Sequence, residues 1–294
     1  YLACVSDQSF LTEHPLQPYS EKYNSPQHPE LTSYNRQWQQ NKAFGQHETT
    51  FISQPLEDVN EQLPGNINQL ISFLSNPAQY FFQQRLGVRF DTETDQLRET
   101  ESFVQDNLEK YQLAEHALAL MISGDSLHVW EQELFASGQL LKGHLGESQL
   151  KAAIHKAGTI YNNLLLEGQA AIYSGYVDCG TVELTGQVEN GYRDTIWNYR
   201  TGQMRKRQLL RAWIEQLFVN ALGHDSATRL VSTKLQSGIV KVENSFLKPV
   251  NRDVATTLLS EFVDLHQQAL TYPLPFLPEL SGQWFESIEK NEAE

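Results

Sequence analysis

Two neighbouring segments of the chain carry polar residues at positions where a pair of strands could bring them together. Residues 184–189 read Leu-Thr-Gly-Gln-Val-Glu and end at Glu189, and residues 196–202 read Ile-Trp-Asn-Tyr-Arg-Thr-Gly and contain Asn198 and Arg200. β-Branched and aromatic residues on both sides of a short turn predict two antiparallel strands. Such a hairpin would bring a carboxylate, an amide and a guanidinium close together.

The spacing of these residues is that of a hairpin that holds one divalent cation in metal-dependent nucleases. There, a Gly-x-x-Asp strand and an Asp-Tyr-Lys-x-Gly strand supply two carboxylates and a lysine. This chain has Glu189, Asn198 and Arg200 at the three positions. An amide lacks the charge that holds a hard ion such as Mg²⁺, and an arginine stays protonated at any working pH. We therefore predict a degenerate nuclease site, with no catalytic residue and no metal or other cofactor.

Two other interpretations of this hairpin are open. In one, it is an ordinary β-meander in which Glu189 and Asn198 are solvated turn residues, because short motifs also occur by chance. In the other, it belongs to an active, divergent Mg²⁺-dependent nuclease. Glu189 would then need ligands from another segment, such as Glu147 or Glu167.

A second candidate site is a basic cluster in which no acidic residue occurs between Thr195 and Ile214. Its members are Arg200, Arg205, Lys206, Arg207 and Arg211. Against a formal net charge of -14, this cluster is the expected place for contact with DNA phosphate or with an acidic partner. The alternative is a solvated loop and helix start. Basic residues oppose the dipole at a helix N-terminus, so we expect something else to compensate.

A third candidate is the proline-rich segment 272–278, which contains Pro273, Pro275, Phe276 and Pro278. Apolar side chains on a polyproline-II-like backbone suit docking to a partner protein. The alternative is a loop that seals the core.

Length and composition limit the class of protein. A chain of 294 residues that is 40% hydrophobic can form one or two globular domains. Its two cysteines, Cys4 and Cys179, are far apart, which argues against a zinc site and a disulfide framework. The sequence has no signal-peptide pattern and no apolar run near 18 residues, so we predict a cytoplasmic protein that does not span a membrane. It starts at Tyr1 rather than Met, and we expect a fragment of a longer protein, with a processed terminus as the alternative.

Residue patterns predict three regions: a loop-rich entry segment (1–65), a helical region (66–140) and an α/β domain (141–294). The helices are expected from Ile67, from Asn76 to Gly87, and at 112–123, 126–136, 146–168, 208–222 and 253–270. Asn76, Ser126 and Asp253 are the expected caps, with Pro77 in the first turn of its helix. The strands are expected at 171–177, 181–189, 193–199, 228–233 and 239–245. This order predicts an α/β (α+β) fold with a mixed, restriction-endonuclease-like sheet flanked by helices.

Four blocks in the same order resemble the C-terminal region of the RecC family, the gamma subunits of exodeoxyribonuclease V. They are Glu-His-Pro-Leu-Gln-Pro-Tyr-Ser (13–20) with Ser-Tyr-Asn-Arg-Gln-Trp (33–38); Asn-Pro-Ala-Gln-Tyr-Phe-Phe-Gln-Gln-Arg-Leu-Gly-Val (76–88); Leu-Leu-Lys-Gly-His-Leu-Gly-Glu (140–147); and Pro-Leu-Pro-Phe-Leu-Pro (273–278) with Trp284. Several blocks in order are more specific than any one of them.

The resemblance implies a subunit of a RecBCD-type complex that unwinds and degrades double-strand ends during repair by recombination. The gamma subunit would split the duplex and guide strands, with DNA reached through the complex and RecB-like and RecD-like subunits as partners. Its C-terminal domain would have a nuclease fold without nuclease chemistry, so the fragment itself would not be an enzyme. The larger N-terminal part of the family is missing here. Besides this non-catalytic subunit and the active nuclease, a third interpretation of the whole chain is a protein interaction domain unrelated to DNA.

Overall fold

The computed structural model of the chain describes residues 12–31, 52, 54–57, 63–89, 106–140, 143–236 and 239–292. Cys4, residues 33–38 of the first RecC-like block and residues 141–142 of the third lie outside these ranges. The chain divides into two compact units, Tyr1–Gln54 and Pro55–Glu294. The predicted boundaries at residues 65 and 140 stay predictions.

The first unit is mostly loop where the structure describes it. The 3₁₀ turn η2 (Glu21–Asn24) is followed by successive hydrogen-bonded turns up to Leu31. The rings of His14 and Tyr23 stack with their centroids 5.9 Å apart.

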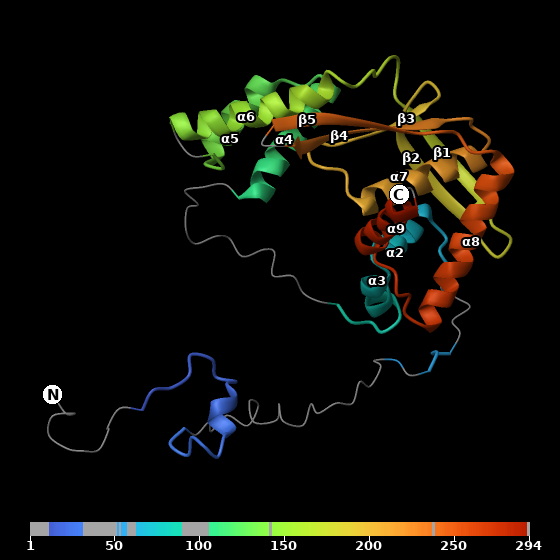
Figure 1. The fold of residues 1–294 in the computed structure, drawn as a ribbon. Helices are drawn as coiled ribbons and strands as arrows, with labels where there is room; N and C mark the ends of the chain where they lie inside the picture. Colours follow the sequence, from blue (N-terminus) through green and yellow to red (C-terminus); the bar gives the residue numbers. More distant parts are fainter. Residues whose placement is uncertain are drawn as a thin grey trace. The chain divides into compact units, whose positions relative to one another are not determined.

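A five-stranded mixed sheet lies at the centre of the second unit (Figure 1). Its strands lie side by side in chain order: β1 (Ala171–Asp178), β2 (Glu183–Tyr192), β3 (Thr195–Tyr199), β4 (Ala227–Gln236) and β5 (Ile239–Leu247). Neighbours are antiparallel except β3 and β4, which are parallel. A parallel pair needs a crossover connection, which α7 (Lys206–Ala221) provides. The predicted α/β fold with a mixed sheet is therefore confirmed.

Helices cover both faces of this sheet because adjacent strand residues point to opposite sides. Ile196 belongs to a core with α2 (Ile67–Ser75), α7 and α8 (Arg252–Thr271). Trp197 belongs to a second core with α4 (Asn107–Ser123), α5 (Leu127–Ser137) and α6 (His144–Tyr161). The remaining helices of the described residues are α3 (Pro77–Gln84) and α9 (Pro278–Glu292). None of the described helices has the length and hydrophobicity that crossing a bilayer requires.

Local capping explains most helix boundaries. Asn76 caps α3 with Pro77 in its first turn, and Ser126 caps α5, as predicted. The prediction for α8 was wrong by two residues, because Asn251 is the cap and accepts a hydrogen bond from the Asp253 backbone N–H.

Two other helix boundaries differ from the sequence prediction. Helix α4 begins earlier than predicted, because Asp106 and Glu109 form a capping box. Helix α6 ends at Tyr161, not near 168, and leaves Leu165 exposed in the following loop.

Candidate functional site

Glu189 and Asn198 lie on the wall of one surface cavity of about 440 Å³. Glu189 is inside β2, which continues to Tyr192 before the turn, so it is not a turn residue. Asn198 is in β3, the next strand of the sheet. The cavity is completed by Asn68 of α2, Gln187, Val188 and Asn190 of β2, and Arg211 and Glu215 of α7. Two strands and two helices therefore form this candidate site.

Glu215 is a cavity residue that the sequence analysis missed. Its side chain is only 13% exposed, and its Oε1 accepts a charge-assisted hydrogen bond of 2.7 Å from Arg211 Nε. The two carboxylates considered from sequence lie elsewhere: Glu167 pairs with Arg193 and Glu147 lies in the first turn of α6. The i,i+4 spacing of Arg211 and Glu215 was the available signal, but only the crossover path of α7 brings them to the cavity.

The polar groups of this cavity do not fit a Mg²⁺ site. The Glu215 carboxylate is neutralised by Arg211, and the Glu189 Oε1 accepts a hydrogen bond of 3.1 Å from Gln187 Nε2. Asn198 contributes a neutral amide whose Nδ2 is buried and has no partner within the described part of the chain. Mg²⁺ prefers carboxylates and keeps near-ideal octahedral geometry. We therefore derive no metal-dependent step for this site.

Arg200 does not line this cavity. Its Nη2 donates to the hydroxyl of Tyr111 on α4 at 2.9 Å, and its guanidinium lies 5.2 Å from the centre of the Tyr111 ring. Burial raises the pKa of Tyr111, with Glu115 as a second cause, so the phenol stays protonated. Arg200 thus connects the end of β3 to α4.

The next residue, Thr201, is fixed by the same helix. Glu115 Oε1 accepts hydrogen bonds from the Thr201 backbone N–H and, at 2.7 Å, from the Thr201 hydroxyl. Thr201 is fully buried, and its carbonyl accepts a hydrogen bond from the Thr233 hydroxyl. The loop before α7 is therefore held between α4 and β4.

The basic cluster is dispersed among different contacts. Lys206 forms an ion pair with Glu286, and Arg211 with Glu215. The side chains of Arg205 and Arg207 are exposed, and no ion pair to either guanidinium occurs among the described residues. These two arginines are the members still available for an external anion.

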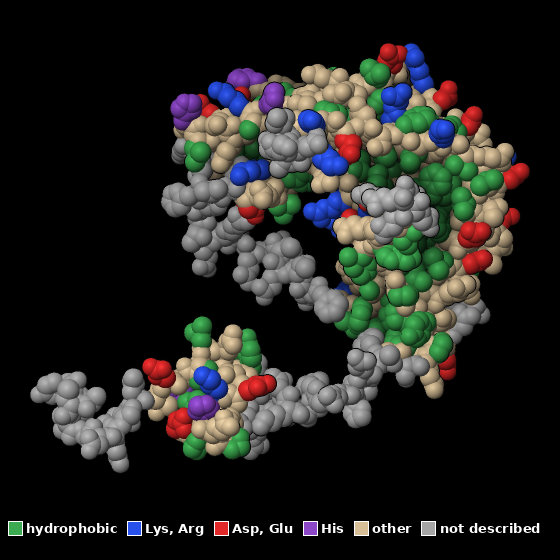
Figure 2. All heavy atoms as spheres, in the orientation of Figure 1, with side chains coloured by type: hydrophobic (Ala, Val, Ile, Leu, Met, Phe, Trp, Pro, Cys, Tyr) green, Lys and Arg blue, Asp and Glu red, His purple; other side chains and the backbone are tan. Residues whose placement is uncertain are grey.

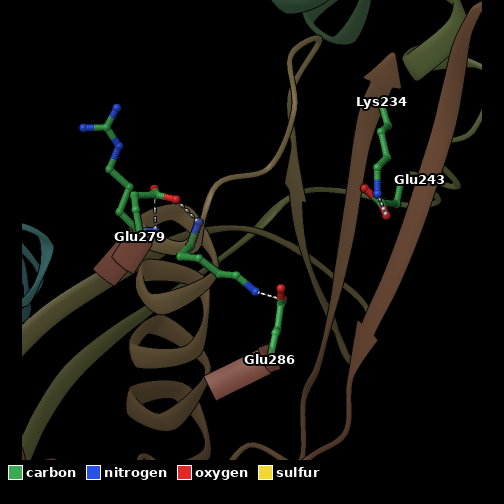
Figure 3. Close-up of polar contacts among 6 residues, drawn as sticks. Lys234, Glu243, Glu279 and Glu286 are labelled. Atoms are coloured by element: carbon green, nitrogen blue, oxygen red, sulfur yellow. Dashed lines mark hydrogen bonds and ion pairs between the residues drawn. The ribbon is translucent and has the colours of Figure 1, made fainter. Parts of the chain in front are cut away.

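Helix α9 supplies the compensation that the basic start of α7 requires. The Glu279 carboxylate accepts the backbone N–H groups of Lys206 at 3.2 Å and Arg207 at 3.4 Å. A carboxylate is favourable at this end of the helix dipole. Figure 3 shows Glu279 and Glu286 beside α7. A second ion pair, between Lys234 and Glu243 at 3.7 Å, lies in the same view. All four residues line a polar cavity of about 610 Å³.

The proline-rich segment is partly buried. Pro278 is buried at the start of α9, Pro273 and Phe276 are half-buried, and Pro275 is exposed. Leu274 packs against the core that contains α7 and α8. Tyr272 and Leu277 of the segment are exposed, and the more exposed apolar side chains lie further along, in α9.

Comparison with known proteins gives one consistent result. The family model described as the RecC C-terminal domain matches residues 63–289. The RecBCD enzyme subunit RecC of Escherichia coli (strain K12) is 26% identical over 262 residues, which are 88% of this chain and 22% of that protein. The subunits of the same name from Buchnera aphidicola subsp. Schizaphis graminum and Haemophilus influenzae are each 22% identical, over 76% and 74% of this chain and 20% and 19% of their own lengths. The chain thus spans about a fifth of the length of these relatives.

Proposed function

The chain belongs to the RecC C-terminal domain family, and from this membership we propose that it is a non-catalytic module of an exodeoxyribonuclease V gamma subunit. In this proposal it assembles with RecB-like and RecD-like subunits in the cytoplasm. The complex acts in double-strand break repair by recombination, and the module helps to route DNA strands within it. The relatives are themselves named as subunits of the RecBCD enzyme, which supports an assembly role.

The observation that carries the non-catalytic part of the proposal is the Arg211–Glu215 pair beside Glu189 and Asn198. A nuclease site of this layout needs carboxylates that are free to hold a cation and a lysine-like base or acid. Here an arginine already neutralises one carboxylate, an amide replaces another, and Arg200 is bound to Tyr111. These contacts support a scaffold role for a nuclease-like hairpin.

Strand routing is supported by Arg205 and Arg207, the exposed members of the basic cluster. Two arginines on a chain with a net charge of -14 give weak phosphate binding alone. We therefore propose that DNA is reached through the complex, in which other subunits supply further contacts.

The assembly part is tested by co-expressing the 294-residue chain with the RecB-like and RecD-like chains of the same genome and measuring the stoichiometry of the purified complex. We expect a stable complex that contains this chain. If the chain elutes alone, with both other subunits folded and present, the assembly role is wrong.

One observation favours a second candidate function, an active divergent nuclease. Glu189 and Glu215 line the same cavity, and rotation of Arg211 away from it would leave two carboxylates there. Titration with Mn²⁺ or Mg²⁺ separates the two proposals, because a cation that binds only the folded state raises the melting temperature. We expect no shift and no cleavage of single-stranded or duplex DNA. Mg²⁺-dependent cleavage that Glu189→Ala abolishes would overturn the non-catalytic proposal.

A further inference from the structure

Helix α9 is attached to the molecule through its polar side. Glu279, Gly282 and Glu286 are spaced i, i+3 and i+7, so they lie on one face of the helix. Glu279 binds the start of α7, and Glu286 forms the ion pair with Lys206 (Figure 3). A side-chain carbon on Gly282 would lie 2.8 Å from Lys206 Cγ and Cδ, so glycine permits this close approach.

The opposite side of α9 is apolar and faces solvent. Leu280, Trp284 and Phe285 are 61%, 67% and 58% exposed. At 100° per residue, Leu280 and Trp284 lie across the helix from the side that carries Glu279, Gly282 and Glu286, and Phe285 lies on the flank between the two sides. Figure 2 shows hydrophobic side chains gathered around the place of α9. A surface helix normally buries its apolar stripe and exposes its charges. Helix α9 has the reverse arrangement.

We propose that Leu280, Trp284 and Phe285 form a docking face for an apolar cleft with a basic rim on another subunit. Large aromatic side chains contribute most of the energy at protein interfaces, and an exposed Trp beside a Phe and a Leu has the composition of such an anchor. The inner contacts hold the helix in place before docking, which reduces the entropy that binding must overcome. This inference rests on the proposed assembly function and names the surface that serves it.

The charge of the chain favours a partner with a basic rim over a second copy of the chain. The helix contains four glutamates and one lysine, and two of the glutamates, Glu279 and Glu286, contact the start of α7. The whole chain carries a formal net charge of -14. Two copies would therefore bring like charges together, whereas a basic rim gives complementary potentials.

The test compares complexes assembled from the full chain with RecB-like and RecD-like subunits. The double variant Leu280→Ser/Trp284→Ser should weaken association at least tenfold, because it removes the two apolar side chains that lie across the helix from its contacts with α7. The matched control is Val129→Ser on α5, which removes an exposed apolar side chain (52%) elsewhere. Both variants should keep the melting temperature of the wild type, since these side chains contact mainly solvent.

Each outcome separates the inference from the assembly proposal. Unchanged association of the double variant, with wild-type chain bound, overturns the docking face and leaves the assembly role intact. A wild-type chain that binds neither subunit overturns both. A dimer of the chain in sedimentation velocity that the double variant abolishes would assign the face to a second copy and contradict the basic partner. Association of the wild type should also weaken as NaCl rises from 0.1 to 0.5 M.

Discussion

Position 186, three residues before Glu189, requires a glycine because two side chains occupy the space that a Cβ would need. A Cβ at this position would lie 2.5 Å from Ile67 Cγ2 and 2.9 Å from Phe218 Cζ. The glycine therefore lets α2 and α7 approach the strand closely. Its position in the Gly-x-x-Glu pattern is a packing requirement, and it does not depend on any metal chemistry at Glu189.

Gly186→Ala tests this packing requirement. We expect the free energy of unfolding in urea to fall by about 1–3 kcal/mol, because the added methyl group overpacks a well-filled core. The control is Gly65→Ala, where no atom lies within 4 Å of the added carbon. Equal stability of the two variants would contradict the close approach of α2 and α7.

The burial of His266 predicts that the stability of the fold depends on pH. The ring is fully buried in α8, its Nε2 is 3.0 Å from the Tyr80 hydroxyl, and its ring centre lies 5.0 Å from that of Phe73. Burial lowers its pKa to about 4. In the unfolded chain the pKa of this histidine is near 6.5. Between pH 6.5 and pH 4 the unfolded chain therefore binds a proton at His266 that the folded chain does not bind.

We expect stability to fall as the pH drops from about 6.5 towards 4, by a limit of roughly 3 kcal/mol for this group. His266→Gln removes the titrating group and should flatten the difference between unfolding free energies at pH 7 and pH 4.5. Urea unfolding of both proteins at the two pH values measures it. A variant with the same pH dependence as the wild type would exclude His266 as the cause.

At the level of elements, the sequence predicts individual helices and strands better than the contacts between them. Alternation or β-branched and aromatic residues between turns identified the strands, and Asn76 and Ser126 marked two helix starts, because these signals are local. The direction of Arg200 was not predictable, because Tyr111, its partner, is 89 positions away in the sequence. The position of Glu215 in the cavity wall likewise depends on the path of the whole of α7.

The attachment of α4 to the loop before α7 depends on Glu115. Glu115→Ala would leave the buried N–H and hydroxyl of Thr201 without acceptors, at a cost of about 1.5–3 kcal/mol. Hydrogen exchange should speed up most in residues 199–206 and in α4. Glu133→Ala, an exposed glutamate of α5, is the control. If exchange in residues 199–206 and α4 of the Glu115 variant is as slow as in the wild type, this carboxylate does not hold the loop.

At the level of the whole molecule, internal pairing decides how much positive charge is available to an external anion. Lys206, Arg211 and Lys234 are paired with glutamates, while Arg205 and Arg207 are exposed. Fewer basic side chains of the cluster are therefore free at the surface than the run of residues in the sequence suggests. The sequence could not show this, because Glu286 comes from a distant helix.

Salt dependence measures the available charge. In the assembled complex, Arg205→Gln/Arg207→Gln should lower the slope of log affinity for labelled DNA against log salt by about 1–2, since each phosphate contact releases about one counterion. Arg211→Gln, which removes an arginine already bound to Glu215, should leave the slope unchanged. Fluorescence anisotropy at several NaCl concentrations gives both slopes. An equal effect of both variants would contradict this division of the cluster.

The parallel pairing of β3 with β4 also has a consequence for how the chain folds. Strands β1 to β3 form one antiparallel meander and β4 and β5 one hairpin, so each group is closed by contacts between near neighbours. The two groups can pair with each other only after the segment that contains α7 has crossed the sheet. Because ordering a longer loop costs more entropy, this pairing is expected to follow the local ones. Formation and docking of α7 would then set the refolding rate, with two halves of the sheet already assembled.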